Sequence, residues 1–347
     1  MKTEFIKIDD KKPLAPQLEG AAAVIRSGGL VVFPTETVYG LGASALSADA
    51  SSKIYAAKGR PSDNPLIIHI DSYKEAGKYC FVEPLYENLA ERFLPGPLTV
   101  IMKKRDIIPK TVTGGLDTVA VRCPENEVAR ELIRLSGVPI AAPSANISGR
   151  PSPTSAEHVR NDLDGKVDVI IDGGACKIGL ESTIIKLDGD TAVLLRPGAV
   201  TPEMIREVVP KLIIDVGVTQ KNQSDSAPLA PGMKYRHYAP KARVYLVVGN
   251  EEKTVAFIKE KLRSDKLVGV LCFDEVADKL SGGHIVRFGS RNDGEAHAKK
   301  LFSALRDFDE TEVNEIYATA VSPEGIDLAT YNRMLKASGY TVIDLGE

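Results

Sequence analysis

Short apolar runs alternate with amphipathic segments along residues 15–210, and this predicts alternating strands and helices. The amphipathic segments predict helices over 17–27, 49–58, 83–93, 125–136 and 202–209. The apolar runs predict strands over 30–34, 65–71, 98–103, 119–122, 139–142, 167–172, 182–187 and 192–196. Because strands outnumber the intervening helices late in this region, a mixed sheet is favoured over a purely parallel one.

The pattern changes after residue 210. Residues 216–242 are polar, rich in Pro, Ser and Ala, and without a period of 2 or 3.6, which is typical of a linker or a functional loop. A second alternation follows, with strands predicted over 244–248, 268–273, 285–288, 315–320 and 341–345 and helices at about 251–264, 273–280, 294–307 and 325–338. It predicts a small open α/β sheet of Rossmann-like type, but without the GxGxxG turn that would support dinucleotide binding.

These two patterns divide the 347 residues into a first domain over 10–210, a linker over 211–242 and a second domain over 243–347. Residues 1–210 hold 25 Lys and Arg against 27 Asp and Glu, a net charge of -2, and the rest hold 19 against 20, a net charge of -1. Neither part is basic, which argues against tight nucleic-acid binding by bulk electrostatics and leaves room only for a local basic groove.

The cysteines and the N-terminus bear on the compartment. Cys80, Cys123, Cys176 and Cys272 form no CxxC pair, so reduced thiols are expected rather than a zinc ribbon or a redox motif. The first residues contain no apolar segment, and no apolar run of about 18 residues occurs. Neither secretion nor a membrane span is therefore expected.

The sequence contains no GxxxxGK[ST] loop, so any ATP site must use scattered cationic side chains. Lys58 and Arg60 flank Gly59 shortly before Asn64-Pro65, and such a cation pair can hold two donors near a polyphosphate. The alternative interpretation is a helix C-terminus followed by a turn, because cations favour that end of a helix.

Two polar loops directly follow apolar runs. SANISG (144–149) offers hydroxyl and amide groups for sugar or phosphate oxygens, and an ordinary polar turn fits it equally well. TETVYGLG (35–42) offers small residues for a close backbone approach to a ligand. Gly40 and Gly42 could also serve a tight turn.

Three further candidates lie within or at the ends of apolar strands. Arg122 and Arg196 each finish one, where an arginine either snorkels to solvent or clamps a carboxylate or phosphate. His69 lies inside the run 65–71, and a lone strand histidine is more often structural than catalytic.

Six segments, taken in order along roughly residues 10–240, resemble one family. They are KGRPSDNPL (58–66), PGPLT (95–99), SANISG (144–149), EST (181–183), RPG (196–198) and APGMKYRHYAP (230–240). The family is that of the threonylcarbamoyl-AMP synthases, or YrdC-like proteins, in their longer two-domain form. The resemblance implies a YrdC-like mixed twisted α/β sheet with helices and a central cavity, followed by a small C-terminal Rossmann-like α/β domain.

The resemblance also implies an activity. Such nucleotidyltransferases combine L-threonine, bicarbonate and ATP into threonylcarbamoyl-AMP and pyrophosphate, with Mg²⁺ on the ATP phosphates and no metal ligands from protein side chains. A second enzyme, a threonylcarbamoyl transferase, then modifies the adenosine beside the anticodon of certain tRNAs. Contact of this chain with tRNA is expected to be weak or indirect, and its location cytoplasmic.

Site residues follow from the same resemblance. Lys58 and Arg60 are implied to be catalytic and, with Asn64, to hold the ATP phosphates. The other implied ATP-binding residues are Thr118, Ser144, Asn146, Ser152, Arg196 and Tyr235, and the implied threonine-binding residues are Thr37, His69, Arg122, Ala142 and Ser182. Tyr235 is implied to fold back from the linker over the nucleotide, with Tyr238 as the alternative ring.

The chemistry joins two anions, a carbamate and ATP, so Lys58, Arg60, Arg122 and Arg196 are expected to converge on one pocket. Alanine at position 58 or 60 should lower turnover with little loss of thermal stability. One alternative is a carbamoyl-adenylate former of hydrogenase maturation, but the zinc-binding cysteine motifs of such proteins do not occur here. Another is an RNA-binding module, which the net charge disfavours.

Overall fold

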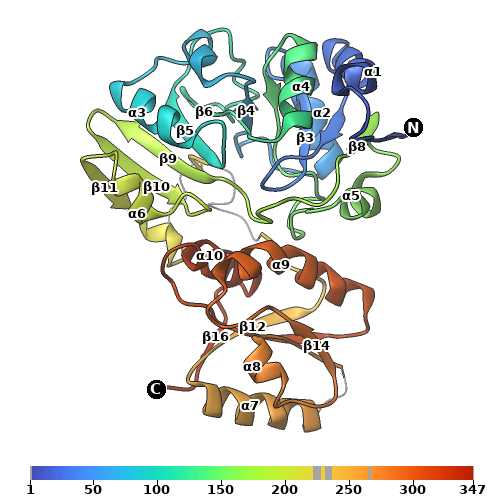
Figure 1. Ribbon diagram of the computed structural model, residues 1–347, viewed down its shortest axis with the longest axis vertical. Coiled ribbons are helices and arrows are strands. Elements are labelled where there is room, and N and C mark those ends of the chain that lie inside the picture. The colour runs from blue at the N-terminus through green and yellow to red at the C-terminus, as the bar shows by residue number, and fades with distance from the viewer. Residues whose placement is uncertain (1, 222–227, 231–236, 265–266, 347) are drawn as a thin grey trace. The chain divides into compact units, whose positions relative to one another are not determined.

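A computed structural model describes residues 2–221, 228–230, 237–264 and 267–346, and they fall into two compact units (Figure 1). Among the described residues, 2–148, 152–218 and 228–230 form the first unit, and 149–151, 219–221 and 237–346 form the second. No helix in these ranges is long and apolar enough to cross a membrane.

The first unit is built on an 11-stranded mixed sheet in the order β1-β8-β2-β3-β7-β4-β6-β5-β9-β10-β11. Its strands are β1 (Glu4–Lys7), β2 (Val31–Phe33), β3 (Gly40–Ser44), β4 (Ile67–His69), β5 (Leu98–Lys103), β6 (Thr118–Arg122), β7 (Ile140–Ala141), β8 (Val169–Asp172), β9 (Thr183–Asp188), β10 (Thr191–Arg196) and β11 (Lys211–Ile214). β4 pairs with β6 in parallel, whereas β7 and β5 run antiparallel to these neighbours. The expected mixed α/β sheet is confirmed.

Helices cover the two faces of this sheet unequally. They are α1 (Leu14–Arg26), α2 (Ala48–Lys58), α3 (Pro84–Phe93), α4 (Glu127–Ser136), α5 (Ala156–Leu163) and α6 (Pro202–Arg206). Side chains of α2, α3 and α5 join one core cluster with Val32, Val100 and Val121. Residues of α1 and α4 form another with Val31 and Phe33, which alternate with Val32 along β2. Opposite faces of the sheet are therefore packed by different helices.

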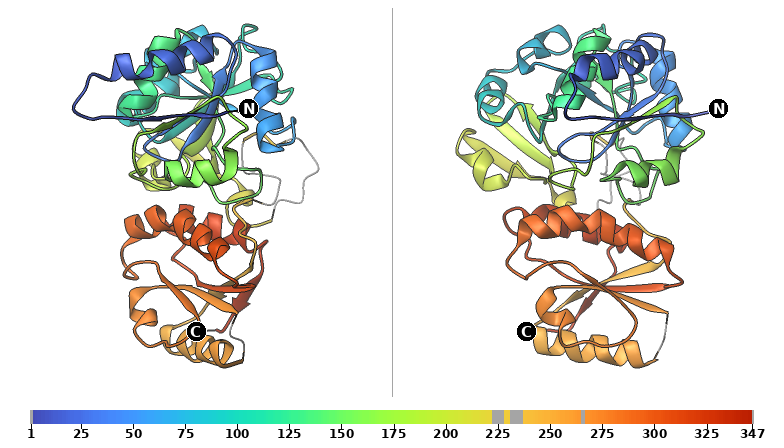
Figure 2. Two further views of the ribbon diagram at one scale, coloured as in Figure 1. Left: turned by 90° about the vertical axis from the view of Figure 1, so that its right-hand side faces the viewer. Right: turned by 45° about the vertical axis from the view of Figure 1, so that its right-hand side comes forward.

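The second unit contains a five-stranded sheet in the order β14-β13-β15-β12-β16, and the strand pairs are parallel. Its elements are β12 (Arg243–Val248), α7 (Glu251–Ser264), β13 (Val268–Cys272), α8 (Asp274–Ala277), β14 (His284–Arg287), α9 (Gly294–Asp307), β15 (Glu315–Thr319), α10 (Asp327–Ala337) and β16 (Val342–Asp344). Figures 1 and 2 show α9 and α10 on one face of this sheet and α7 and α8 on the other. The expected α/β alternation is confirmed. With the five strands numbered along the chain, their order is 3-2-4-1-5, which differs from the 3-2-1-4-5-6 order of dinucleotide-binding sheets.

Three strands and one α-helix of the first unit were not predicted: β1, β3, β11 and α5. β3 contains the glycines that the sequence also allowed in a turn. They are paired with β2 and β7 in a strand, and a side chain there would meet the ring of Phe33, because a Cβ built on Gly42 would lie 2.7 Å from Phe33 Cε1. β11 lies within the segment expected to be the linker, and Lys211–Ile214 pairs in parallel with β10 and extends the sheet.

Candidate functional site

One face of the first sheet carries a row of polar side chains around an apolar floor. Along β6, Val119 and Val121 enter the core beneath the sheet, so Thr118, Ala120 and Arg122 lie on the other face. Register places His69 of β4 and Thr99 of β5 beside Arg122 on this face. The floor between its polar ends is a small apolar cluster of Ile67, Ile101, Ala120, Ile184, Leu195 and Ala230.

Lys58 lies at the amino end of β4, where α2 ends. Ser47 caps the start of α2, with its Oγ 3.2 Å from Ala50 N, and Gly59 ends it in the left-handed region with φ of 61°. The Lys58 side chain is 2% exposed and its Nζ donates to the carbonyl oxygens of Ser144 and Asn146. The helix-end interpretation of Lys58 is therefore confirmed, and its side chain also contacts the 144–146 loop.

The 144–146 loop is held from several sides. Ser144 Oγ donates to Asn146 Oδ1 at 2.6 Å, and Asn146 Nδ2 donates to Ile147 O at 2.8 Å. Ala145 N donates to Tyr39 O at 2.8 Å, and Gly40 pairs with Ser144 in an antiparallel bridge. The loop is therefore a continuation of the β3–β7 pairing, and it brings two of the predicted polar side chains beside Lys58.

Arg60 and Asn64 lie in the segment that leads into β4. Arg60 is half-buried, and its guanidinium donates to Asn64 O at 3.3 Å and Pro65 O at 3.1 Å. Asn64 is 1% exposed, and its Oδ1 has no hydrogen-bond partner among the described residues. Tyr55 Oη anchors the segment by donating to Thr111 O at 2.9 Å. This end of the floor therefore combines cations with a buried, unpaired acceptor.

Thr118 and Ala142 make no side-chain hydrogen bond with the described residues, and the strands determine where they lie. Thr118 begins β6 opposite Lys103, and it lies four residues, or about 13 Å, before Arg122. Ala142 follows β7, and its N–H donates to Ile67 O at 2.9 Å. Both border the apolar floor, Thr118 at the end where β6 begins.

His69, Arg122 and Glu36 meet at the other end of β4 and β6. Arg122 is 4% exposed, Nη2 pairs with Glu36 Oε1 at 2.5 Å, and Nε donates to Gly96 O at 3.4 Å. Burial, and then the positive charge of Arg122, lowers the pKa of His69 to about 3, so the imidazole is neutral. His69 Nδ1 has no hydrogen-bond partner in the described part of the chain.

Thr37 belongs to a tight turn after β2. Its hydroxyl exchanges a 2.8 Å hydrogen bond with Thr35 Oγ1, which also donates to Val38 O at 2.6 Å. Thr35 Oγ1 in turn accepts from the backbone N–H groups of Thr37 and Val38, both at 3.2 Å. The Thr35 hydroxyl thus fixes the Thr37 side chain.

Arg196 and Ser182 connect the strands at the far side of the floor. Arg196 Nε donates to Ser182 O at 3.0 Å, and Nη2 donates to Ser182 Oγ at 3.1 Å. Thr99 Oγ1 lies 2.7 Å from the same Ser182 hydroxyl. Ser152 is fully buried and donates to Glu181 Oε1 at 2.5 Å, directly before Ser182 in the chain. Arg196, which is implied to bind ATP, and Ser182, which is implied to bind threonine, are therefore in direct contact.

The structure brings most of the predicted residues to one face, in three groups. Lys58, Ser144 and Asn146 are joined by hydrogen bonds, with Arg60 and Asn64 before β4. Arg122 and His69 lie together, and Arg196 contacts Ser182. Lys58, Arg122 and Arg196 are 2%, 4% and 4% exposed and Arg60 is half-buried, so none of the four cations points into bulk solvent.

Tyr235 and Tyr238 are the two linker tyrosines proposed to reach the nucleotide. Tyr235 lies outside the described residues. Tyr238 is 4% exposed, and its ring centroid is 5.1 Å from that of Phe302 and 6.0 Å from Arg333 Cζ. The Tyr238 ring is therefore part of the packing of the second unit.

Sequence reasoning missed three residues that hold the site together: Glu36, Thr99 and Glu181. Each lies inside or beside a segment that was singled out, but only as part of a motif. Glu36 and Glu181 are buried carboxylates that contact Arg122 and Ser152. An acidic residue inside a hydroxyl-rich loop after an apolar strand was the available signal, because a buried carboxylate requires a partner.

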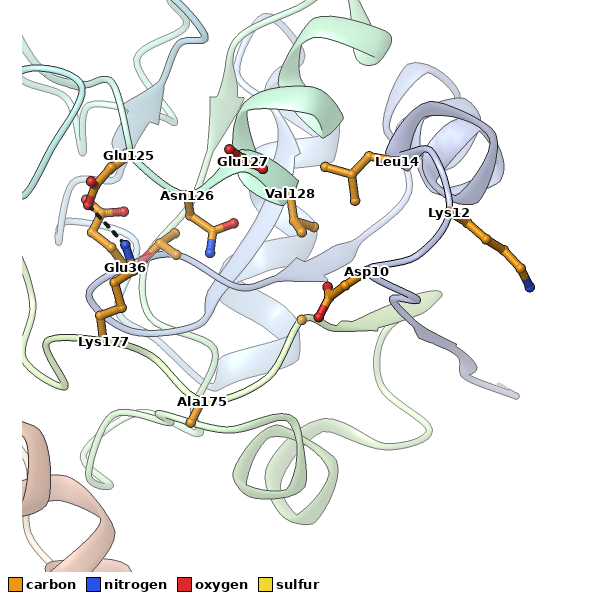
Figure 3. Close-up of a pocket in the computed structure, with 12 residues that line it drawn as sticks. Asp10, Lys12, Leu14, Glu36, Glu125, Asn126, Glu127, Val128, Ala175 and Lys177 are labelled. Atoms are coloured by element: carbon orange, nitrogen blue, oxygen red, sulfur yellow. Dashed lines mark ion pairs between the residues drawn. The ribbon is translucent and has the colours of Figure 1, made fainter.

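A separate cavity of about 520 Å³ lies beyond the turn at Thr35 and Glu36. Its lining comprises Asp10, Lys12, Leu14, Thr35, Glu36, Glu125, Asn126, Glu127, Val128, Gly173, Ala175 and Lys177. Figure 3 shows Glu125 and Lys177 as an ion pair at its border, with atoms 3.9 Å apart. None of the predicted site residues lines this cavity.

Two family models together match most of the chain. A family model described as "Telomere recombination" matches residues 23–198, and one described as "Threonylcarbamoyl-AMP synthase, C-terminal domain" matches residues 200–339. The threonylcarbamoyl-AMP synthase of Bacillus subtilis is 46% identical over 348 residues, covering 99% of this chain and 100% of the relative. That of Pyrococcus abyssi is 49% identical over 331 residues, covering 93% of this chain and 94% of the relative.

A solved structure is similar over both units. The crystal structure of P. abyssi Sua5 in complex with L-threonine superposes with a TM-score of 0.92 at 46% identity. The match covers 99% of this chain and 100% of that one.

Proposed function

The chain belongs to the threonylcarbamoyl-AMP synthase family, and from this premise we propose that it makes threonylcarbamoyl-AMP from L-threonine, bicarbonate and ATP on the polar face described above. The chain is an enzyme of the nucleotidyltransferase type and acts in the first step of tRNA threonylcarbamoyladenosine synthesis. One observation supports the location most directly. Buried or half-buried cations stand at both ends of one apolar floor about 13 Å long, which suits two anionic substrates that must meet.

The end formed by Arg122, His69, Thr37 and Ser182 suits an amino acid with a hydroxyl side chain. Arg122 supplies a guanidinium for the carboxylate. Neutral His69, with its unpartnered Nδ1, supplies an uncharged group for a hydroxyl or an amine. The aliphatic part of the substrate would then contact the apolar floor. We assign L-threonine to this end.

The end where β4 and β6 begin suits the nucleotide. Lys58 and Arg60 provide positive charge for phosphate oxygens, and Asn64, Thr118, Ser144 and Asn146 provide amide and hydroxyl groups for phosphate or sugar oxygens. Lys58 and Arg60 would stabilise the negative charge that builds up on the phosphates during reaction. Arg196, Ser152 and Tyr235 complete the proposed ATP set.

The reaction proceeds in two steps. The threonine amine attacks the carbon of bicarbonate, a C–N bond forms, and water leaves to give the carbamate. A carbamate oxygen then attacks the α-phosphorus of ATP, the bond to the bridging oxygen of the β-phosphate breaks, and pyrophosphate leaves. Holding both reactants along one floor removes much of the entropic barrier, an effect of up to roughly 7–11 kcal/mol in well-oriented systems.

We propose that Mg²⁺ enters with ATP. Lys58 and Arg60 at the nucleotide end are cations, which fit phosphate oxygens rather than a metal ion, so the phosphates themselves would hold the metal. When bound there, Mg²⁺ neutralises phosphate charge and assists the departure of pyrophosphate. The product would pass to a separate threonylcarbamoyl transferase, which is the partner that contacts tRNA.

The test is pyrophosphate release by the purified chain with threonine, bicarbonate, MgCl₂ and ATP. Release should depend on threonine and bicarbonate, and it should fall when serine or valine replaces threonine. Release that is indifferent to threonine would reject the assignment of the substrate. Loss of release with EDTA would support entry of ATP as its magnesium complex.

A further inference from the structure

Glu36 is a buried carboxylate whose two oxygens have different surroundings. Its side chain is 2% exposed, Oε1 pairs with Arg122 Nη2 at 2.5 Å, and Oε2 has no hydrogen-bond partner among the described residues. A carboxylate withdrawn from water at this cost needs a strong partner. The contact with Arg122 is the one that satisfies this need.

The backbone around Glu36 is fixed on both sides. Thr35 Oγ1 accepts from Thr37 N and Val38 N and donates to Val38 O, which closes the turn. Ile178 N donates to Glu36 O at 2.9 Å, which ties the turn to the 176–179 segment. The carboxylate is therefore presented to Arg122 from a rigid support.

Arg122 is held at two of its three nitrogens. Nη2 bonds Glu36 Oε1 and Nε bonds Gly96 O, and Nη1 has no protein partner in the described part of the chain. A planar guanidinium that is fixed at two positions has a fixed direction at the third. The donor on Nη1 is thus aimed before any ligand arrives.

We propose that Glu36 is a positioning residue for the amino-acid substrate. It acts through Arg122, whose guanidinium it holds so that Nη1 faces the substrate carboxylate. The inference rests on the proposed function, since it takes threonine to bind at Arg122. It adds a residue that touches no substrate and determines how well the carboxylate is recognised.

A purely neutralising role for Glu36 makes a different prediction from a positioning role. Glu36→Gln removes the charge but keeps an oxygen where Oε1 accepts from Nη2. Glu36→Asp keeps the charge but withdraws the carboxylate by one bond, about 1.5 Å. Positioning requires the oxygen at its place, whereas neutralisation requires only the charge nearby.

The experiment measures KM for threonine and for ATP, kcat, and thermal unfolding of the full chain and its variants. Positioning predicts that Glu36→Asp raises KM for threonine roughly 10-fold or more, as for loss of a charge-assisted hydrogen bond, with KM for ATP little changed. Glu36→Gln should stay within about threefold of the parent for threonine, because the oxygen contact remains. Glu36→Asp combined with Arg122→Ala should match Arg122→Ala alone in KM for threonine, because the residue acts through the guanidinium.

Asp168→Asn is the matched control, because Asp168 is a half-buried carboxylate of the same unit that accepts from Leu30 N at 2.7 Å. It should lower the melting temperature without a selective change in KM for threonine. The inference is overturned if Glu36→Gln is impaired and Glu36→Asp is not, or if both variants lose only stability. Failure of the proposed function would appear separately, as a parent chain without threonine-dependent pyrophosphate release.

Discussion

Arg196 contacts Ser182 twice, with Nε 3.0 Å from the Ser182 carbonyl oxygen and Nη2 3.1 Å from its hydroxyl. The sequence resemblance assigns Arg196 to ATP and Ser182 to threonine, so this contact joins the two proposed substrate sites. Thr99 bonds the same hydroxyl from β5. A change at any of the three residues is therefore expected to reach both sites.

Replacing Arg196 with lysine tests this coupling. Lysine keeps the charge but cannot make two bonds in one plane, so Ser182 should lose its fixed orientation. We expect kcat/KM to fall by about 10- to 100-fold, with KM raised for threonine as well as for ATP. Steady-state kinetics with each substrate varied in turn provide the measurement.

Arg206→Ala is the control for this experiment, since the Arg206 side chain is 50% exposed and pairs only with Glu203 at 3.7 Å among the described residues. It should leave both constants unchanged. If Arg196→Lys raises KM for ATP alone, the contact with Ser182 does not couple the two sites.

Alanine substitutions of Lys58 and Arg60 are expected to destabilise the chain by different amounts, which revises the expectation from sequence. The sequence predicted little thermal effect of alanine at either position. Because Lys58 Nζ is buried against two backbone carbonyl oxygens, Lys58→Ala should cost about 1–3 kcal/mol of the free energy of unfolding. Arg60 is half-buried, so Arg60→Ala should cost less, about 0.5–1.5 kcal/mol.

Both variants should also raise KM for ATP, which kinetic assays well below their melting temperatures would detect. Denaturant unfolding supplies the stability difference. A Lys58→Ala variant with parental stability would show that the contacts with the 144–146 loop contribute nothing to the folded state. A variant with parental kinetics would remove Lys58 from the proposed ATP site.

Elements with strong local signals were predicted well from the sequence. The helices expected at 251–264 and 294–307 and the strand at 98–103 agree with α7, α9 and β5. Their periodic apolar positions are a local signal that can be read directly from the sequence. β3 was missed because the reason for its glycines is the ring of Phe33, which the local pattern does not reveal.

The site residues also divide into those with a local signal in the sequence and those that depend on a distant partner. Lys58 and Arg122 stand out as cations beside apolar segments, so their residue type and place made them candidates. Glu36 was passed over because its partner lies 86 positions away in the sequence. The pairing depends on which strands become neighbours in the mixed sheet, and one sequence contains no direct signal for that order.

His69 predicts a pH dependence of stability. Its pKa is lowered to about 3 by burial and by Arg122, against about 6.5 in the unfolded chain. Between these values the unfolded state binds the proton and the folded state does not, so the stability that neutral His69 permits is present above pH 6.5 and is lost as pH falls. Each pH unit in this window costs up to about 1.4 kcal/mol.

His69→Gln removes this titration. Between pH 6.5 and pH 5.5 the variant should therefore lose about 0.5–1 kcal/mol less stability than the parent chain, as measured by urea unfolding at each pH. The comparison is made within each protein, so a constant loss from the substitution itself cancels. Equal losses in the two proteins would mean that His69 is not held neutral by the fold.

The linker offers the last test, because one of its residues packs on the proposed site. Ala230 is fully buried in the apolar floor with Ile67 and Ala120, so the described part of the linker already lies against the surface that the substrates would use. Excluding water there would protect a carbamate that decomposes in solution. A chain that ends at Val218 keeps β11 and the buried Val218 but lacks Ala230.

We expect this truncated chain to fold and to lose most of its threonine-dependent pyrophosphate release. Ala230→Arg in the full chain should have the same direction of effect, because it places a charge on the apolar floor. Circular dichroism and thermal unfolding of the truncated chain establish whether the first unit is folded. Full activity in a folded, truncated chain would show that the linker is no lid, since the reaction would then proceed on a face that nothing covers.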